Sequence, residues 1–174
     1  QTLSLLLAQL TLRPAHREHL RSPKRGLSDE QIEALGFKST PPPFLCRSIT
    51  DRLIRQGCRV QGVPGFYRDD SGHWTMAFYK KTSGILIPAI GFDGRLQGFQ
   101  IMLDVPLKHK DDPPEKPGAK YIWFSSSSKT DGTGSGSPVH LIGDPSARVV
   151  YVIEGLLKAD ISHCLTGRTF AAIA

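Results

Sequence analysis

The feature that most constrains the fold of this chain is an apolar run at residues 149–153, Val-Val-Tyr-Val-Ile, followed by Glu154 and Gly155. Buried strands of parallel sheets read as near-continuous apolar runs, and ligands of open α/β sheets bind outside the carboxyl ends of the strands. The run therefore predicts a buried strand that presents Glu154 at the rim of a sheet.

The residues after Gly155 continue this pattern as a helix and a second strand. The segment at about 156–165 predicts a helix, Gly167 follows as its C-cap, and residues 169–173 read as a strand. A strand, a crossover helix and a further strand are expected to form a βαβ unit with parallel strands.

A glutamate at a strand end, followed by glycine, suits a hard cation. Mg²⁺ binds one or two carboxylates, keeps several waters and completes its shell with substrate phosphates. Lys158 follows one helical turn later and leans back toward Glu154, so it is placed to pair with the carboxylate or to contact a phosphate. One carboxylate is too few, and we expect further acids from later strands beyond Ala174.

Basic residues exceed acidic ones by 22 to 16, which gives a net charge of +6 and a pI of about 9.4. The surplus is concentrated at residues 13–25 and 47–59. Such a balance favours an anionic partner such as nucleic acid. Each basic segment is consistent with a phosphate-tracking surface or with a solvated helix face.

Cysteine and histidine spacing argues against zinc. Cys46, Cys58 and Cys164 lie far apart and form no Cys-x-x-Cys pair, which argues against a zinc ribbon and a disulfide framework. We therefore expect no zinc site, and reduced thiols in a cytoplasmic protein. His16 and His19 lack companion ligands and are interpreted as helix-surface residues.

The leucine-rich start, residues 1–12, is too short to span a bilayer and lacks the features of a signal peptide, so no membrane partner is expected. The absence of an initiating methionine and the end at Ala174 indicate a piece of a longer protein.

The first sixty residues read as helical. Ser28 and Gln31 have the spacing of a capping box, and Gly36 marks the end of that short helix. A second helix is predicted at 47–56, after the stiff proline run at 41–43. Two helices with a basic outer face suggest either a helix-turn-helix reader or a helical cap packed on the next unit.

Period-two patterning takes over after Gly62. Strands are predicted at 74–79, 85–90, 98–103 and 121–124. Asp93-Gly94 predicts a β-hairpin, and Pro88 predicts a bulge or an edge position because it cannot donate a ladder hydrogen bond. The charged, proline-rich segment 108–118 predicts an exposed loop.

A serine run at 125–128 and a glycine-rich segment at 131–137 follow. They lack the Gly-Lys-Ser/Thr of a P-loop. The segment is either a flexible loop or a place where hydroxyls, backbone amides and Lys129 receive phosphates.

The sequence at 149–160, Val-Val-Tyr-Val-Ile-Glu-Gly-Leu-Leu-Lys-Ala-Asp, resembles the first motif of the Toprim domain of bacterial primases, topoisomerases and related nucleases. The preceding region is similar to the basic, β-rich subdomain that holds template and nucleotides in primases, through segments 84–90, 93–100, 120–121 and the serine run. With residues 25–28 and 62–67, the motif is most similar to a domain family of unknown function. That family occurs in replication proteins of plasmids and integrative elements, often alongside helicase modules.

The resemblance covers about residues 12–174 and implies that Glu154 is a catalytic acid–base group or a ligand of Mg²⁺ or Mn²⁺. The residues expected to face nucleic acid or nucleotides are Arg95, Lys120, Ser125, Ser126, Lys129 and Lys158. Two departures from the family are the second Toprim motif, Asp-x-Asp, and the zinc module common in primases, which these 174 residues lack. We therefore expect this chain alone to be inactive.

We predict an α+β fold with a helical N-terminal cap at 1–60, a β-rich basic subdomain at 61–147 and the start of a Toprim domain at 148–174. The predicted parent protein is a primase-like, Mg²⁺-dependent nucleotidyltransferase in mobile-element DNA replication. Its expected partners are DNA or RNA, nucleotides and a replicative helicase. The alternatives are a non-catalytic DNA-binding module that regulates a helicase, a Toprim nuclease, and an unrelated α/β enzyme.

Overall fold

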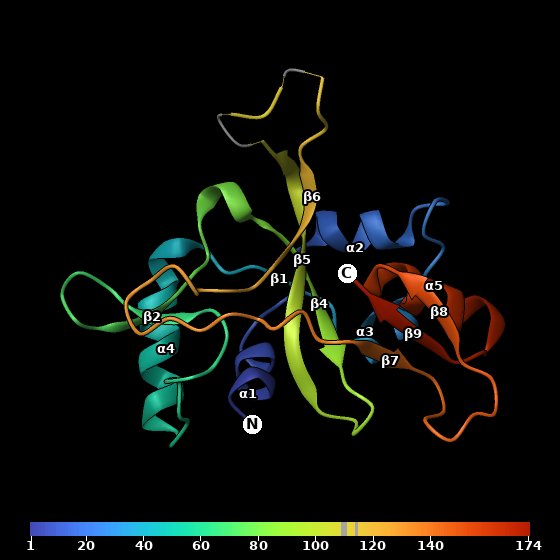
Figure 1. Ribbon diagram of the computed structural model, residues 1–174, viewed down its shortest axis with the longest axis horizontal. Coiled ribbons are helices and arrows are strands. Elements are labelled where there is room, and N and C mark those ends of the chain that lie inside the picture. The colour runs from blue at the N-terminus through green and yellow to red at the C-terminus, as the bar shows by residue number, and fades with distance from the viewer. Residues whose placement is uncertain (109–110, 114) are drawn as a thin grey trace.

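The computed structural model describes residues 1–108, 111–113 and 115–174; residues 109, 110 and 114 of the predicted loop lie outside the described part. Its centre is a four-stranded antiparallel sheet in the order β1-β4-β5-β6 (Figure 1). These strands are β1 (Lys38–Ser39), β4 (Gly84–Ile90), β5 (Leu96–Leu107) and β6 (Ala119–Trp123).

The other elements flank this sheet. The helices are α1 (Thr2–Ala8), α2 (Pro14–Arg21), α3 (Asp29–Ala34), α4 (Cys46–Arg55) and α5 (Leu156–Thr166), with 3₁₀ turns at Pro43–Leu45 and Lys80–Thr82. The remaining strands are β2 (Phe66–Arg68), β3 (Trp74–Met76), β7 (His140–Ile142), β8 (Tyr151–Glu154) and β9 (Phe170–Ile173).

The predicted hairpin joins β4 to β5. Gly91 N donates to Arg95 O over 2.9 Å, and Gly94 takes a φ of +72° in the turn. The ladder register shifts just beyond Pro88, between Ala89 and Ile90. The short strand β1 pairs with β4 only at residues 85 and 86. The predicted bulge or edge position near the proline is therefore confirmed.

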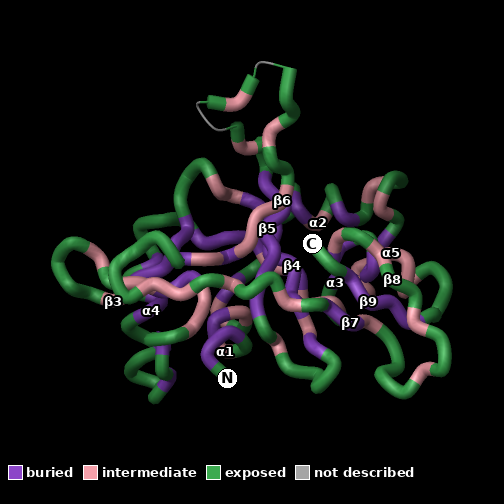
Figure 2. Tube along the Cα trace, viewed as in Figure 1, coloured by how far each residue is buried: buried purple, intermediate pink, exposed green. Residues whose placement is uncertain are grey.

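The middle of the central sheet, β4 and residues 98–103 of β5, is buried on both faces, which explains why these two segments read as continuous apolar runs (Figure 2). On one face, Leu86, Ile101 and Phe124 belong to a core formed with α1, α4 and the β2–β3 hairpin. On the other face, Ile87 and Met102 pack in a second core with residues of α2, α3, α5 and β9. Figure 1 shows α4 and α5 on opposite sides of β5.

The helices predicted in the first sixty residues are present, and α3 has the predicted capping box. Gln31 N donates to Ser28 Oγ over 3.2 Å, and Ser28 N donates to Gln31 Oε1 over 2.8 Å. The region is not wholly helical, because residues 38 and 39 form β1 in the central sheet. Ile49 and Leu53 of α4 are buried in the first core, an arrangement that fits a packed helical cap.

His16 differs from the prediction of a helix-surface residue. Its ring is buried, with Nδ1 2.8 Å from Ser39 Oγ and Nε2 2.8 Å from Asp104 Oδ1. The cause is the position of α2 against β1 and β5, which supply those two polar partners. Burial lowers the pKa of His16, and the hydrogen bond to Asp104 opposes that effect.

The predicted βαβ unit is present: β8 and β9 are parallel, and Gly167 ends α5 in the left-handed conformation with a φ of +66°. The prediction that the strand is buried was wrong. The strand begins at Tyr151 and is the edge of a sheet ordered β7-β9-β8, so Val152 is 72% exposed. Among the described residues only β9 pairs with β8, so the other edge of β8 is open.

A buried hydrogen bond between His140 and Asp160 fastens this unit to the central sheet. His140 Nδ1 accepts from Ile90 N over 3.0 Å, and His140 Nε2 lies 2.9 Å from Asp160 Oδ1. Since Nδ1 is an acceptor, the ring proton is on Nε2 and is donated to the carboxylate. The pair therefore links β4, β7 and α5.

Within the described ranges, no helix combines the length and the apolar character needed to cross a bilayer.

Candidate functional site

Glu154 opens onto a cavity of about 380 Å³ between the central sheet and the start of α5. The lining residues are Gln100, Tyr121, Ile122, Trp123, Ser137, Glu154, Gly155, Leu157, Lys158 and Ala174. The exposed Glu154 is the last residue of β8, opposite Ile173 of β9. The predicted position of the carboxylate at a strand end, at the rim of a sheet, is thus the observed one.

Gly155 is required for its backbone conformation more than for space. It has a φ of +91°, and its N–H donates to Ile173 O over 2.8 Å. A Cβ at this position would meet only the Lys158 side chain, at 3.9 Å. The left-handed conformation favours glycine and turns the chain sharply from β8 into α5.

Glu154 and Lys158 line the same cavity, one helical turn apart. In the part of the chain that the structure describes, neither forms an ion pair within 4.0 Å. A carboxylate and an ammonium group that remain available can serve different parts of one ligand. The carboxylate suits a cation and the ammonium suits a phosphate.

The floor of the cavity comes from β5 and β6. Gln100 lies opposite Trp123 in the ladder, and the next pair on this face is Met102 with Tyr121. Gln100 is buried, yet its Oε1 has no hydrogen-bond partner among the described residues. An unpaired buried polar atom costs about 1–3 kcal/mol.

A basic cluster borders Tyr121. Arg25 donates weakly to the Tyr121 hydroxyl, with Nη2 3.5 Å from the oxygen. Burial, followed by the charges of Arg25, Lys120 and Lys24, lowers the pKa of His19. Lys120, one of the predicted nucleic-acid residues, therefore sits among other cations next to the cavity.

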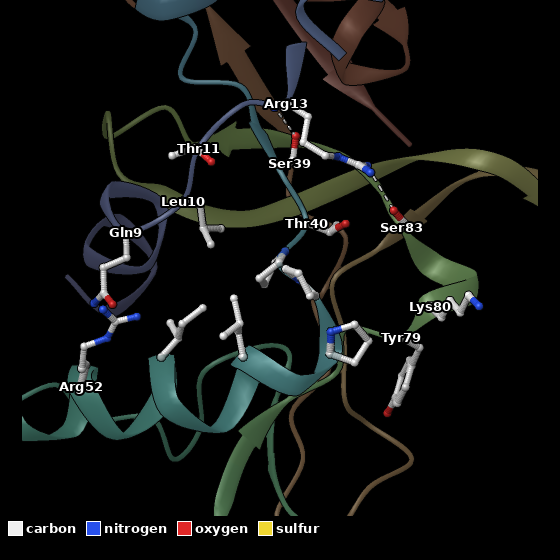
Figure 3. A pocket seen from close by; sticks show the side chains of 15 residues that line it. Gln9, Leu10, Thr11, Arg13, Ser39, Thr40, Arg52, Tyr79, Lys80 and Ser83 are labelled. Atoms are coloured by element: carbon white, nitrogen blue, oxygen red, sulfur yellow. Dashed lines mark hydrogen bonds between the residues drawn. The ribbon is translucent and has the colours of Figure 1, made fainter. Parts of the chain in front are cut away.

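A second hollow, which we call the cationic groove, lies between α1, α4 and the 3₁₀ turn at Lys80–Thr82 (Figure 3). Its volume is about 460 Å³, and the cations Arg13, Arg52 and Lys80 line it. No acidic side chain is among its described lining residues, although Arg13 Nη2 lies 2.9 Å from Asp104 Oδ2 outside the lining. Thr11, Ser39, Thr40, Tyr79 and Ser83 add hydroxyls, and Leu10, Leu45, Ile49 and prolines 41–43 add apolar walls.

Lys129 extends the cationic groove past Tyr79. Its Nζ lies 5.7 Å from the centroid of the Tyr79 ring and 5.8 Å from that of Tyr67. Burial, with a hydrogen bond to Tyr79, raises the pKa of Tyr67 to about 12. The Tyr67 phenol stays neutral, and the cation lies between two aromatic rings.

The serine run and Arg95 lie elsewhere. The Ser126 hydroxyl is buried; it donates to Phe66 O over 2.6 Å and accepts from Thr133 N over 3.0 Å, so it organises its own loop. Ser125 is half-buried and lies 3.5 Å from the Ser127 hydroxyl. Arg95 is exposed in the hairpin turn, 3.7 Å from Asp93, and lines neither hollow.

The sequence placed Lys158 one helical turn after Glu154, and both residues line the cavity, but the sequence did not indicate the floor of the cavity. The available signal was Gln100, a polar residue inside the apolar run 98–103. Nothing in the spacing of Arg52 and Lys80 indicated that they share a groove, because α4 and a distant turn supply them.

The residues of the cavity fit a magnesium ion only in part. Glu154 carries the sole carboxylate side chain among the described lining residues, and the described chain holds no cluster of three or more His, Cys, Asp or Glu side chains suited to a metal. Mg²⁺ is often held by one or two carboxylates together with substrate phosphates. Glu154 can therefore supply one ligand of a shared site.

No protein-family model and no curated protein matches this chain. Solved structures match it over nearly its whole length. The zinc-binding and RNA polymerase domains of Aquifex aeolicus primase align with a TM-score of 0.64 and 14% identity, over 99% of this chain and 40% of that one. The RNA polymerase domain of Mycobacterium tuberculosis primase DnaG, in complex with a double-stranded DNA oligomer with a 6-nucleotide overhang, aligns with a TM-score of 0.61 and 21% identity, over 98% and 54%.

A DnaG primase catalytic domain bound to ssDNA aligns with a TM-score of 0.57 and 19% identity, over 100% of this chain and 52% of that one. The chain thus has a primase-like fold. It spans about half the length of the primase chains that it matches.

Proposed function

We propose that this chain is the nucleotide- and nucleic-acid-binding part of a primase-like, Mg²⁺- or Mn²⁺-dependent nucleotidyltransferase that acts in mobile-element DNA replication. The observation that carries the proposal is the cavity in which Glu154 and Lys158 face the central sheet of a primase-like fold. The Toprim resemblance of residues 149–160 adds to it.

In this proposal Glu154 holds the cation together with nucleotide phosphates, and Lys158 contacts a phosphate. The cation, when bound, activates the attacking hydroxyl and stabilises the leaving oxygen of phosphoryl transfer. Lys120 and its neighbours Lys24 and Arg25 attract the backbone of a strand that enters the cavity.

The cationic groove is the proposed surface for single-stranded nucleic acid. Arg52 and Lys80 have no acidic partner within 4.0 Å among the described residues, so both remain available for phosphates. Tyr79 and Lys129 supply an aromatic face and a further cation. Grooves that combine cations with aromatic rings bind single strands without sequence preference, since every base can stack.

The proposed units are the helical cap (1–60), the basic β-rich subdomain (61–147) and the start of a Toprim domain (148–174). Arg95 and Ser125 remain proposed peripheral contacts to nucleic acid, and a replicative helicase remains a proposed partner. Polymerisation requires acids beyond Glu154, so the full activity belongs to the longer protein.

Primer synthesis by the full-length protein tests this function. Glu154→Gln keeps the size of the side chain and removes its charge, so we expect metal-dependent synthesis to fall at least 100-fold. Glu18→Gln, an exposed glutamate on α2 that lines neither hollow, should leave synthesis unchanged. Unchanged synthesis by Glu154→Gln would refute the assignment. Strand cleavage instead of synthesis would favour a nuclease, and DNA binding with neither activity would favour a binding module.

A further inference from the structure

We propose that Trp123 stacks on the base of the nucleotide whose phosphates meet Glu154 and Lys158, so that the cavity accepts any nucleoside triphosphate and favours purines. This inference rests on the proposed function, because it names the substrate class of the same cavity. It gives a role to an aromatic residue of β6 that neither the charged pair nor the Toprim motif explains.

The cavity has two chemically different sides. Glu154 and Lys158 line it from the end of β8 and the start of α5. Tyr121 and Trp123 line it from β6. A ligand that meets both sides needs a charged end and a flat, apolar end, which is the composition of a nucleotide. The volume of about 380 Å³ falls in the range of small-molecule sites.

The indole of Trp123 reaches across to the neighbouring strand. Trp123 is opposite Gln100 in the ladder, and Gly98 lies two positions before Gln100 on the same face of β5. A Cβ placed at Gly98 would lie 3.9 Å from Trp123 Cζ3 and 3.6 Å from Pro138 Cγ, so the bare glycine accommodates both side chains. An indole that extends diagonally in this way lies along the sheet, which leaves one of its faces to the cavity that it lines.

Trp123 is accessible to a ligand. It is half-buried, and among the described residues its indole N–H has no hydrogen-bond partner. The nitrogen is not one of the buried unpaired atoms, so it is in contact with solvent. The hydroxyl of Tyr121, in contrast, lies 3.5 Å from Met102 Sδ and 3.5 Å from Arg25 Nη2. Trp123 is therefore the aromatic side chain of the cavity whose ring and polar atom are both available.

Stacking defines the range of bases that the cavity accepts. Every base has a π-face, so stacking on an aromatic ring does not depend on the hydrogen-bonding groups of the base. The two rings of a purine cover more of an indole than the single ring of a pyrimidine, and the gain grows with the apolar area that is buried. The Oε1 atom of Gln100 is buried and out of reach of a ligand, so it does not select among bases.

The test titrates the full-length protein, with Mg²⁺ present, with ATP, GTP, UTP and inorganic tripolyphosphate, which has no base. We expect ATP and GTP to bind within about threefold of each other and about tenfold more tightly than tripolyphosphate, with UTP between them. Trp123→Leu should remove the difference by weakening the nucleotides alone, and Trp123→Phe should keep most of it. The matched control is Trp74→Leu, which changes the other tryptophan of these 174 residues. Trp74 lies under Arg68, lines neither hollow and should not affect the ratio.

Fluorescence distinguishes stacking from a purely structural role of the indole. The emission of Trp123 is the difference between the wild-type protein and Trp123→Leu. ATP should quench this emission, whereas tripolyphosphate should leave it unchanged, because only a base can stack on the ring. Equal quenching by the two ligands, or by neither, would contradict stacking.

The outcomes of the titrations separate the two proposals. Equal binding of ATP and tripolyphosphate by the wild-type protein would overturn the role of Trp123 while leaving the phosphate site intact, and this comparison needs no variant to fold. A preference for ATP that persists in Trp123→Leu would overturn it as well, and so would GTP that binds much more weakly than ATP. Failure of all four ligands to bind would overturn both the inference and the proposed function.

Discussion

The Glu154 cavity and the cationic groove differ in the way they distribute charge. The cavity combines the Glu154 carboxylate, the Lys158 ammonium group and the aromatic rings of Tyr121 and Trp123. Each of these groups suits a different part of a ligand. The described lining of the groove carries cations and hydroxyls but no acidic side chain, beside prolines and Tyr79; of its cations, Arg13 is paired with Asp104. The cavity is thus suited to a defined small ligand, whereas the groove is suited to a repeating phosphate backbone.

The largest expected difference between the two sites comes from the hydrogen bond between His140 and Asp160, which holds α5, one wall of the cavity, against β4. Asp160→Ala removes the buried partner of His140, and we expect it to lower the free energy of unfolding by about 1–3 kcal/mol. Since the pair fastens α5 to β4, nucleotide binding should weaken more than DNA binding in the groove. Asp160→Asn retains an acceptor oxygen and should cost less in urea unfolding. Equal losses for the two variants would contradict the role given to the hydrogen bond.

A smaller effect is expected in the groove. Arg52→Ala combined with Lys80→Ala should weaken single-stranded DNA binding about tenfold and reduce the log–log salt slope by about 1.4, since each phosphate contact contributes roughly 0.7. Nucleotide binding in the cavity should not change. The control is Arg55→Ala with Lys81→Ala, two exposed cations next to these positions that do not line the groove. An identical slope for the two double variants would remove the groove from the account.

The smallest expected effect is a pH dependence beneath the groove. The unfolded chain protonates His16 near pH 6.5, whereas burial lowers its pKa in the fold. As the pH falls below 6.5, the unfolded state therefore binds more protons than the folded state, and the free energy of unfolding decreases. The pKa of Asp104 is also lowered, by hydrogen bonds from Ser83 and Arg13 that outweigh the opposing effect of burial, so its contribution is lost only below about pH 3.8.

Thermal unfolding from pH 7.5 to 5 measures this dependence. His16→Gln should flatten the curve in that window, although His19, whose pKa is also lowered, retains part of the slope. A slope unchanged by His16→Gln would show that the buried imidazole does not titrate as described.

The sequence was informative where a local rule decides the structure. Asp93-Gly94, the Ser28–Gln31 box and Gly167 mark a turn and two helix ends through interactions between near neighbours in the chain. The βαβ order followed from the same kind of pattern. The exposure of β8 could not be predicted, because an apolar run does not indicate how many strands pair with it or what packs on its faces.

The parts of the site that escaped prediction depend on distant contacts. His16 is buried because residues 23 and 88 positions away provide its partners, Ser39 and Asp104. The groove gathers cations from α4, a distant turn and the segment before α2. Such convergence depends on tertiary packing, which hydrophobic periodicity does not encode.

The central claim is that the two sites are separate, with a cation-dependent nucleotide site at Glu154 and a strand-binding surface in the groove. The most direct test measures Mg²⁺-dependent ATP binding and single-stranded DNA binding side by side in full-length Glu154→Gln. We predict that Mg²⁺-dependent nucleotide binding falls at least tenfold, while DNA affinity and its salt slope stay at the wild-type values. Loss of both activities together, or of neither, would contradict the account.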